Sequence, residues 1–180
     1  MKKLVMHVLL LCAGCYSIRQ FTAYKAETDK NNPDVVQYYS TSVEIVPVEF
    51  GSPWFSEFTI WFRKDSQGEA WYLKTRRVGK SWLYVQRMQL LVDTVKVDLT
   101  SEFYPLRTTQ ALERSAQVEE NTFAVPENFV HRMKNAQSIS IRLVGQEFYE
   151  KADLTPVDIR NIGWFYDYIV VGALKREPEI

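Results

Sequence analysis

The cysteines and histidines of this chain decide which chemistry is open to it. Cys12 and Cys15 lie near the amino terminus, behind an apolar run that contains His7; beyond them the chain has His131 and no further cysteine. A zinc site needs about four His, Cys or carboxylate ligands, and a hydroxyl nucleophile usually needs a histidine base. The seven glycines are dispersed and form no phosphate-binding loop. We therefore expect no metal, no cofactor and no enzymatic activity.

Carboxylates are the remaining groups that could do catalysis. Glu119 with Glu120, or Glu147 with Glu150, could supply the acid and base of a hydrolase, which holds two carboxyl groups about 5–10 Å apart across a cleft. A chain with 22 acidic residues contains such pairs by chance. We favour solvated strand or turn positions for them, and a carboxylate-only hydrolase remains an alternative.

The amino terminus has the organisation of an export signal. Two lysines open the chain, and an apolar block follows over residues 4–12. The block is shorter than the roughly 20 residues of a membrane span and has the length of a secretory hydrophobic region, about 7–15 residues. Two small residues then precede Cys15. The segment CAGC at 12–15 resembles the lipobox of bacterial lipoprotein signal peptides, with Cys12 where that family usually has leucine.

This resemblance implies lipid attachment. In that family the cysteine thiol carries diacylglycerol and the new amino group is acylated, for example with palmitate. Residues 1–14 would be removed, and Cys15 would become the first residue and hold the protein on a membrane, because each buried methylene contributes about 0.8 kcal/mol. Tyr16, rather than aspartate, follows Cys15; by the same resemblance this favours the outer membrane of the bacterial cell envelope, facing the periplasm. An ordinary secretory signal and a first helix of the fold are the alternatives.

Composition limits the partners and the domain count. The chain has 22 basic and 22 acidic side chains, and loss of the two leader lysines leaves a slight acidic excess. Nucleic-acid-binding proteins usually carry a strong basic excess, so we expect no nucleic acid partner. Residues 35–180 have the length of a single globular domain. The polar segment 15–34 is expected to be a lipidated start followed by a flexible tether.

The rest of the chain favours antiparallel strands. Apolar and polar residues alternate over 58–63, 95–99 and 139–143, which is typical of half-buried strands. The segments KDSQGE at 64–69 and VGKS at 78–81 have turn composition. These features predict a meander of hairpins.

Two helices are expected, near 126–136 and 156–171. Thr155 is a suitable N-cap of the second, and Asp158 stands three residues later, as in a capping box. The segment ALERSAQVEE at 111–120 suits a helix and a polar strand about equally well. The predicted fold class is α+β and mostly β: an antiparallel sheet, as a sandwich or open barrel, covered by the two helices.

Aromatic and basic residues give a candidate binding surface. Trp61 and Tyr72 alternate with expected core residues and so can face away from the core, and exposed aromatic patches often mark binding surfaces. The segment KTRRVGK adds Lys74, Arg76 and Arg77 at a predicted hairpin tip, where they could touch anionic lipid. The alternatives are a second buried face under the helices and a solvated turn.

The function expected from these features is that of a non-enzymatic, membrane-anchored envelope lipoprotein. It would act as a protein-binding or structural module, with an envelope protein as its partner. A lipocalin-like carrier of a small apolar ligand is the alternative, and it requires an interior cavity of several hundred Å³.

Overall fold

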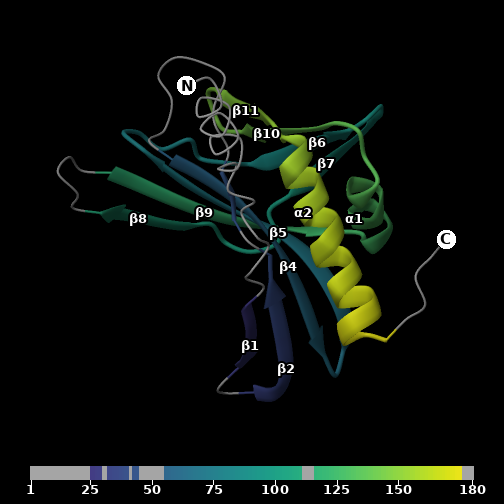
Figure 1. Ribbon diagram of the computed structural model, residues 1–180. Helices are drawn as coiled ribbons and strands as arrows, with labels where there is room; N and C mark the ends of the chain where they lie inside the picture. Colours follow the sequence, from purple (N-terminus) through teal and green to yellow (C-terminus); the bar gives the residue numbers. More distant parts are fainter. Residues whose placement is uncertain (1–24, 30–31, 41, 45–54, 111–115, 176–180) are drawn as a thin grey trace, which may run out of the picture.

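The computed structural model describes residues 25–29, 32–40, 42–44, 55–110 and 116–175 (Figure 1). The predicted leader at 1–14 and the predicted lipid site at Cys15 lie outside the described residues. Within the described ranges, no helix combines the length and the apolar character needed to cross a bilayer.

The described strands form two antiparallel sheets, which confirms the predicted fold class. The larger, seven-stranded sheet has the order β1-β2-β4-β5-β9-β8, with β3 also paired to β4. Its strands are β1 (Lys25–Asp29), β2 (Asn32–Tyr39), β3 (Val43–Glu44), β4 (Phe55–Asp65), β5 (Gly68–Gly79), β8 (Leu106–Gln110) and β9 (Ala116–Val125).

The second sheet is four-stranded, with the order β11-β10-β6-β7. Its strands are β6 (Arg87–Val92), β7 (Val95–Thr100), β10 (Ile139–Val144) and β11 (Tyr149–Asp153). An isolated bridge from Ser101, just after β7, to Phe123 on β9 brings the two sheets together. One of the two sheets curls into a half-barrel.

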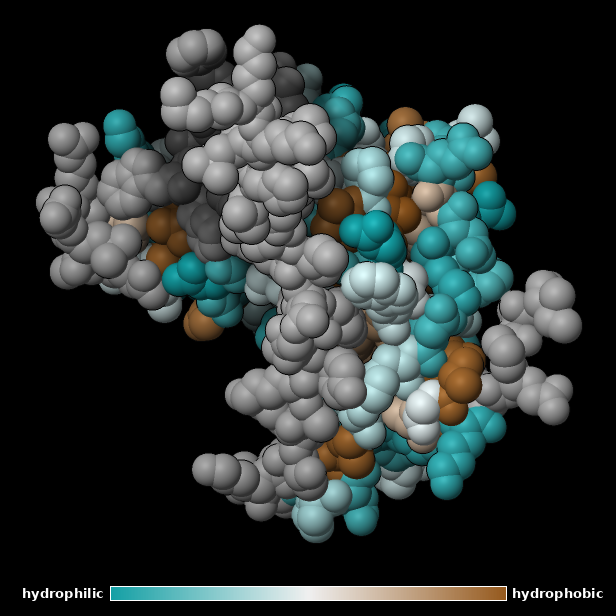
Figure 2. Space-filling view, viewed as in Figure 1, coloured by the Kyte–Doolittle hydropathy of each residue, from teal (hydrophilic) through white to brown (hydrophobic). Residues whose placement is uncertain are grey.

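Both predicted helices are present and cover the inner side of the larger sheet (Figure 1). They are α1 (Glu127–Lys134) and α2 (Pro156–Asp167), and α2 continues into a π-helical segment, η1 (Tyr168–Ala173). The predicted capping box is formed: the Asp158 amide donates to the Thr155 hydroxyl, and the Asp158 carboxylate accepts from the Thr155 amide. On this side of the molecule, hydrophobic residues appear as separate spots among hydrophilic ones (Figure 2).

The core lies between the sheets and the helices. Strand alternation supplies it, because every second residue of β4, β5, β6 and β10 points inward. Its largest fully buried side chains include Phe58, Ile60, Phe62, Leu73, Met88, Leu90, Phe123, Ile139, Ile141 and Phe165. Trp71 on β5 packs against Phe165 and Tyr166, and this contact holds α2 to the sheet.

The expected tether is wrong in its second part. Residues 25–29 form β1, and residues 32–34 begin β2, to which β1 pairs from Lys25 opposite Tyr39 to Asp29 opposite Asn32. The physical reason is the free edge of β2. One side of β2 bonds to β4, and β1 satisfies the backbone groups on the other side.

The expected hairpin tip at KTRRVGK is also wrong. These residues lie inside β5 and at its end, and β5 pairs with β9 as far as Gly79 opposite Gln117. After Gly79 the chain does not turn back beside β5; residues 80–86 carry it across to β6 in the other sheet. The polar segment at 111–120 resolves as strand from residue 116 onward.

Candidate binding surface

The outer face of the seven-stranded sheet carries a row of stacked aromatic rings. The strand register places Tyr39 opposite Trp61 and Trp61 opposite Tyr72. The Tyr39 and Trp61 rings are nearly parallel, at 8° and 5.9 Å between centroids, and Trp61 and Tyr72 stack at 4.4 Å. Phe103, beyond Tyr72, extends the row at 6.0 Å. We call Tyr39, Trp61, Tyr72 and Phe103 the aromatic row.

Charged side chains lie beside this row. The Lys74 ammonium is 5.4 Å from the Tyr39 ring centre and 5.5 Å from that of Trp61, within cation–π range. Arg76, two residues on, pairs at 3.3 Å with Glu120 on β9. Tyr39, Glu57, Thr59, Lys74, Arg76 and Glu120 line a shallow depression of about 190 Å³.

The rings face one another rather than solvent. Ring faces along the row are occupied by the neighbouring rings and, at Tyr39 and Trp61, by the Lys74 ammonium. The Tyr39 hydroxyl donates to Gln37 at 2.6 Å, and burial raises the pKa of this phenol above its ordinary value. The row is therefore uncharged and preorganised, with Tyr72 only 9% exposed, and it is flanked by a lysine and an Arg–Glu pair.

Four of the five predicted surface residues lie on this face, and Arg77 does not. Trp61, Tyr72, Lys74 and Arg76 have the outward parity of their strands, whereas Arg77 points inward and is only 3% exposed. The Arg77 Nε donates to Glu150 on β11 at 2.8 Å, and Nη1 donates to the Ser81 carbonyl at 2.6 Å. Arg77 thus connects the two sheets from inside.

A second buried charge fixes the segment between the sheets. The Glu119 carboxylate is completely buried. It accepts the amides of Leu83 at 3.2 Å, Tyr84 at 3.0 Å and Val85 at 2.6 Å. Arg107 on β8 donates to the same carboxylate at 3.3 Å. Three consecutive amides without strand partners are thereby satisfied, and residues 83–85 are held in an irregular conformation.

Two glycines allow this packing. At Gly79 a Cβ would lie 2.9 Å from the Arg77 guanidinium nitrogens. At Gly145 a Cβ would overlap the Leu83 carbonyl oxygen, which instead accepts the amide of Gln146 at 3.2 Å. The sharp passage from β5 to β6 therefore depends on both small residues.

In each carboxylate pair considered for hydrolysis, one member is buried rather than solvated as expected. Glu119 and Glu120 are neighbours on β9, so they point to opposite faces of the sheet. Glu147 is exposed in the turn before β11, while the Glu150 side chain is buried against Arg77. Burial raises the pKa of the Glu150 carboxyl, and Arg77 opposes that shift. Both buried carboxylates hold the fold together and are occupied by donors.

The carrier alternative finds no support in the described part of the chain. The interior there is filled by large apolar side chains, and two depressions of about 190 and 200 Å³ are open and lie on outer sheet faces. In the same ranges, no three His, Cys, Asp or Glu side chains gather in a way that could hold a metal ion. His131 packs against Tyr166 at 5.4 Å between ring centroids.

Sequence reasoning missed Tyr39 and Phe103. Tyr39 stands beside Tyr38 in the sequence, and alternation alone does not say which of the two meets Trp61; the register of β2 with β4 decides it. Phe103 lies after β7, and nothing local connects it to Tyr72. No family model, no curated protein and no solved structure matches this chain.

Proposed function

We propose that this protein is a lipid-anchored component of a bacterial envelope that binds another envelope protein through its aromatic row. The membrane part rests on the lipobox-like CAGC segment and on Cys15. The binding part rests on the outer face of the seven-stranded sheet. The protein would sit at the outer membrane, facing the periplasm, and act as a binding or structural module without catalysis.

The observation that carries this proposal is the stacking of Tyr39, Trp61 and Tyr72 across three strands. Each ring is held by its neighbours and by the sheet, so little side-chain entropy remains to be lost on binding. Tyrosine and tryptophan are also enriched among residues that dominate protein–protein affinity. A flat sugar would need open ring faces, and these faces are covered by one another and by Lys74, so a protein partner suits the aromatic row better.

Site-specific photo-crosslinking in the native cells tests the proposal. A photoreactive residue at Glu57, which lines the depression beside the row, is compared with one at Val157, exposed on α2. We expect an adduct of one defined mass from position 57 and not from position 157. Adding Trp61→Ala should abolish the adduct, and Trp164→Ala, which removes an exposed tryptophan on α2, should leave it. The same adducts from both positions, or an adduct indifferent to Trp61, would contradict the proposal.

A further inference from the structure

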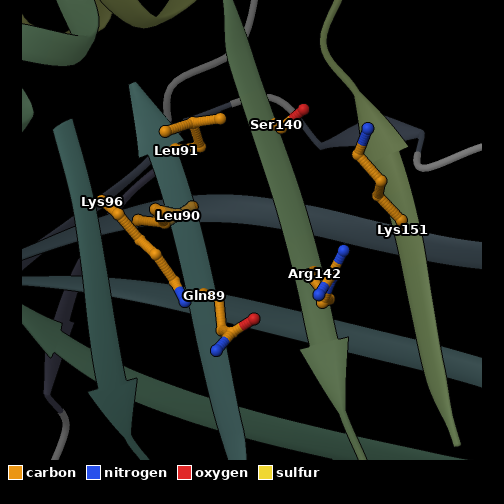
Figure 3. A pocket seen from close by; sticks show the side chains of 7 residues that line it. All are labelled: Gln89, Leu90, Leu91, Lys96, Ser140, Arg142 and Lys151. Carbon is orange, nitrogen blue, oxygen red and sulfur yellow. The ribbon is translucent and has the colours of Figure 1, made fainter. Parts of the chain in front are cut away.

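The outer face of the four-stranded sheet carries a cluster of cations. Arg142 on β10 lies opposite Lys151 on β11 and Gln89 on β6. Arg87 and Lys96 share this face by the register of β6 with β7. Figure 3 shows Lys96, Arg142 and Lys151 around a shallow depression of about 200 Å³. We call Arg87, Leu91, Lys96, Arg142, Tyr149 and Lys151 the basic face.

The charges of the basic face are poorly compensated. Within the described residues, Arg87 and Arg142 have no carboxylate within ion-pair distance, and the Arg142 guanidinium lies over the Tyr149 ring at 4.3 Å. Lys96 and Lys151 pair with Asp98 at 3.9 Å and Asp153 at 3.4 Å. These two pairs are solvent-exposed and therefore weak. Because the whole chain has equal numbers of acids and bases, this local positive excess is distinctive.

Exposed apolar side chains surround these cations at one end of the sheet. Tyr149 begins β11, and Phe148 precedes it in the turn; each is 43% exposed. Tyr84 is 44% exposed and belongs to the segment whose Leu83 carbonyl accepts the Gln146 amide of the same turn. Leu91 is exposed near the opposite end of the face, beside Lys96. Aromatic rings thus lie at the Tyr149 end of the basic face, where one of them contacts the Arg142 guanidinium.

Tyr84 has a strained backbone that the buried Glu119 carboxylate maintains. Its φ is +53°, a left-handed conformation that a bulky residue rarely adopts. The buried Glu119 carboxylate accepts its amide and those on either side, and Arg107 lies 5.1 Å from its ring centre. The buried charge thus fixes the backbone beneath a half-exposed ring. Strain of this kind is often found at functional positions.

We propose that the basic face docks on the anionic headgroup surface of a bilayer. Lipid phosphates would lie near Arg87, Arg142 and Lys151, and the Phe148 and Tyr84 rings would enter the headgroup layer. Aromatic side chains with a polar end are favoured at that depth. The inference rests on the proposed membrane location, but it uses no residue involved in lipid attachment.

The charge of the basic face favours lipid over a protein partner. Its four cations are spread over four strands, and only two of them have carboxylate partners, in exposed pairs. A headgroup layer supplies many phosphates without a fixed geometry, which suits cations on flexible arms such as Lys96 and Lys151. The Arg142 guanidinium, which has no carboxylate within ion-pair distance among the described residues, can also donate hydrogen bonds to two phosphate oxygens at once.

Vesicle co-sedimentation of the chain carrying Cys15→Ser, which cannot be acylated, tests this docking. We expect binding about tenfold tighter to phosphatidylcholine vesicles with about 30% phosphatidylglycerol than to phosphatidylcholine alone, and release at about 0.5 M NaCl. The double variant Arg87→Glu/Arg142→Glu should lose this preference. Lys64→Glu/Arg132→Glu changes the net charge equally at exposed positions elsewhere and should keep it. Circular dichroism checks that each variant is folded.

Four results would overturn the inference. The first is equal binding to both vesicle types, and the second is an equal loss of binding in both double variants. The third is release from vesicles by millimolar inorganic phosphate. The fourth is that the wild-type chain does not bind vesicles at all, while Arg87→Glu/Arg142→Glu removes a cross-link to a protein. The third result would indicate a site for free phosphate, and the fourth a protein partner. Because Cys15 is absent from this experiment, failure of lipidation and failure of docking are distinguishable.

Discussion

The two outer sheet faces use the same residue types in opposite ways. On the seven-stranded sheet, Trp61 lies between Tyr39 and Tyr72, and the neighbouring Arg76 is paired with Glu120. On the four-stranded sheet, Arg142 has a tyrosine ring beneath it and no carboxylate partner among the described residues, and Tyr149 is widely exposed. The first face has its rings stacked and its arginine paired, whereas the second leaves rings and cations open to solvent.

This difference has a consequence for recognition. A preorganised aromatic row loses little entropy on binding and suits a partner of fixed shape. Solvent-exposed cations and half-exposed rings suit a soft, charged surface, whose attraction depends on salt. One small domain can therefore present a protein-binding face and a lipid-binding face that are distinguished by how their residues are paired.

The largest expected effect on stability comes from removing the buried Glu119 carboxylate, which binds the segment between the two sheets. Glu119→Ala leaves three amides of residues 83–85 unsatisfied and should lower the free energy of unfolding by about 3–5 kcal/mol. Glu120→Ala, one residue later on the outer face, removes only a partly exposed pair and should cost less than about 1 kcal/mol. Urea unfolding of both variants measures the contrast. Similar losses would mean that Glu119 does not connect the sheets.

A smaller effect separates the two faces directly. Trp61→Ala removes two stacked contacts, and the free energy of unfolding should fall by about 2 kcal/mol. Tyr149→Ala removes an exposed ring and should change it by no more than about 0.5 kcal/mol. Denaturant unfolding of the two variants gives this comparison. Equal losses would remove the distinction between a preorganised face and an open one.

The smallest effects are pH dependences of opposite sign on one strand, β11. Burial raises the pKa of Glu150, so its contribution to stability is present below the ordinary carboxyl pKa and is lost as pH rises through the raised value. The hydrogen bond from Ser140 lowers the pKa of Asp153, so its contribution is present above the ordinary pKa and is lost as pH falls.

Stability measured against pH tests both signs. As pH rises through the raised pKa of Glu150, the wild type should lose stability relative to Glu150→Gln. As pH falls through the lowered pKa of Asp153, it should lose stability relative to Asp153→Asn. The Asp153 effect should be weaker, because that carboxylate is exposed and screened by solvent. If the difference in unfolding free energy between wild type and variant changed with pH in the same direction at both positions, the opposite environments of Glu150 and Asp153 would be contradicted.

Local patterns predicted the strands and helices well. Alternation at 139–143 and the Thr155 capping box are properties of neighbouring residues, and both are present as expected. The path between the sheets was not predictable in this way. VGKS has the composition of a turn, yet residues 80–86 cross to the second sheet because Glu119, more than 30 positions later, holds their amides.

The candidate surface was only partly predictable, because strand alternation gives the face on which a residue lies but not its partner in another strand or sheet. Parity along β4 and β5 places Trp61 and Tyr72 on the outer face and Arg77 on the inner one. Parity does not reveal the partner of Arg77, which is Glu150 in the other sheet. Strand β1 was missed because its sequence, KAETD, has no apolar alternation; it pairs with a free edge that only the assembled sheet provides.

The proposed membrane anchor is tested most directly by the intact mass of the mature protein, measured together with its fractionation. The account predicts a chain that starts at Cys15, carries diacylglycerol and an amide-linked acyl group, and sediments with membranes. The Cys15→Ser chain should lack both groups and lose this stable attachment. An unmodified amino terminus, a start at another residue, or a wild-type protein found entirely in the aqueous fraction would contradict it.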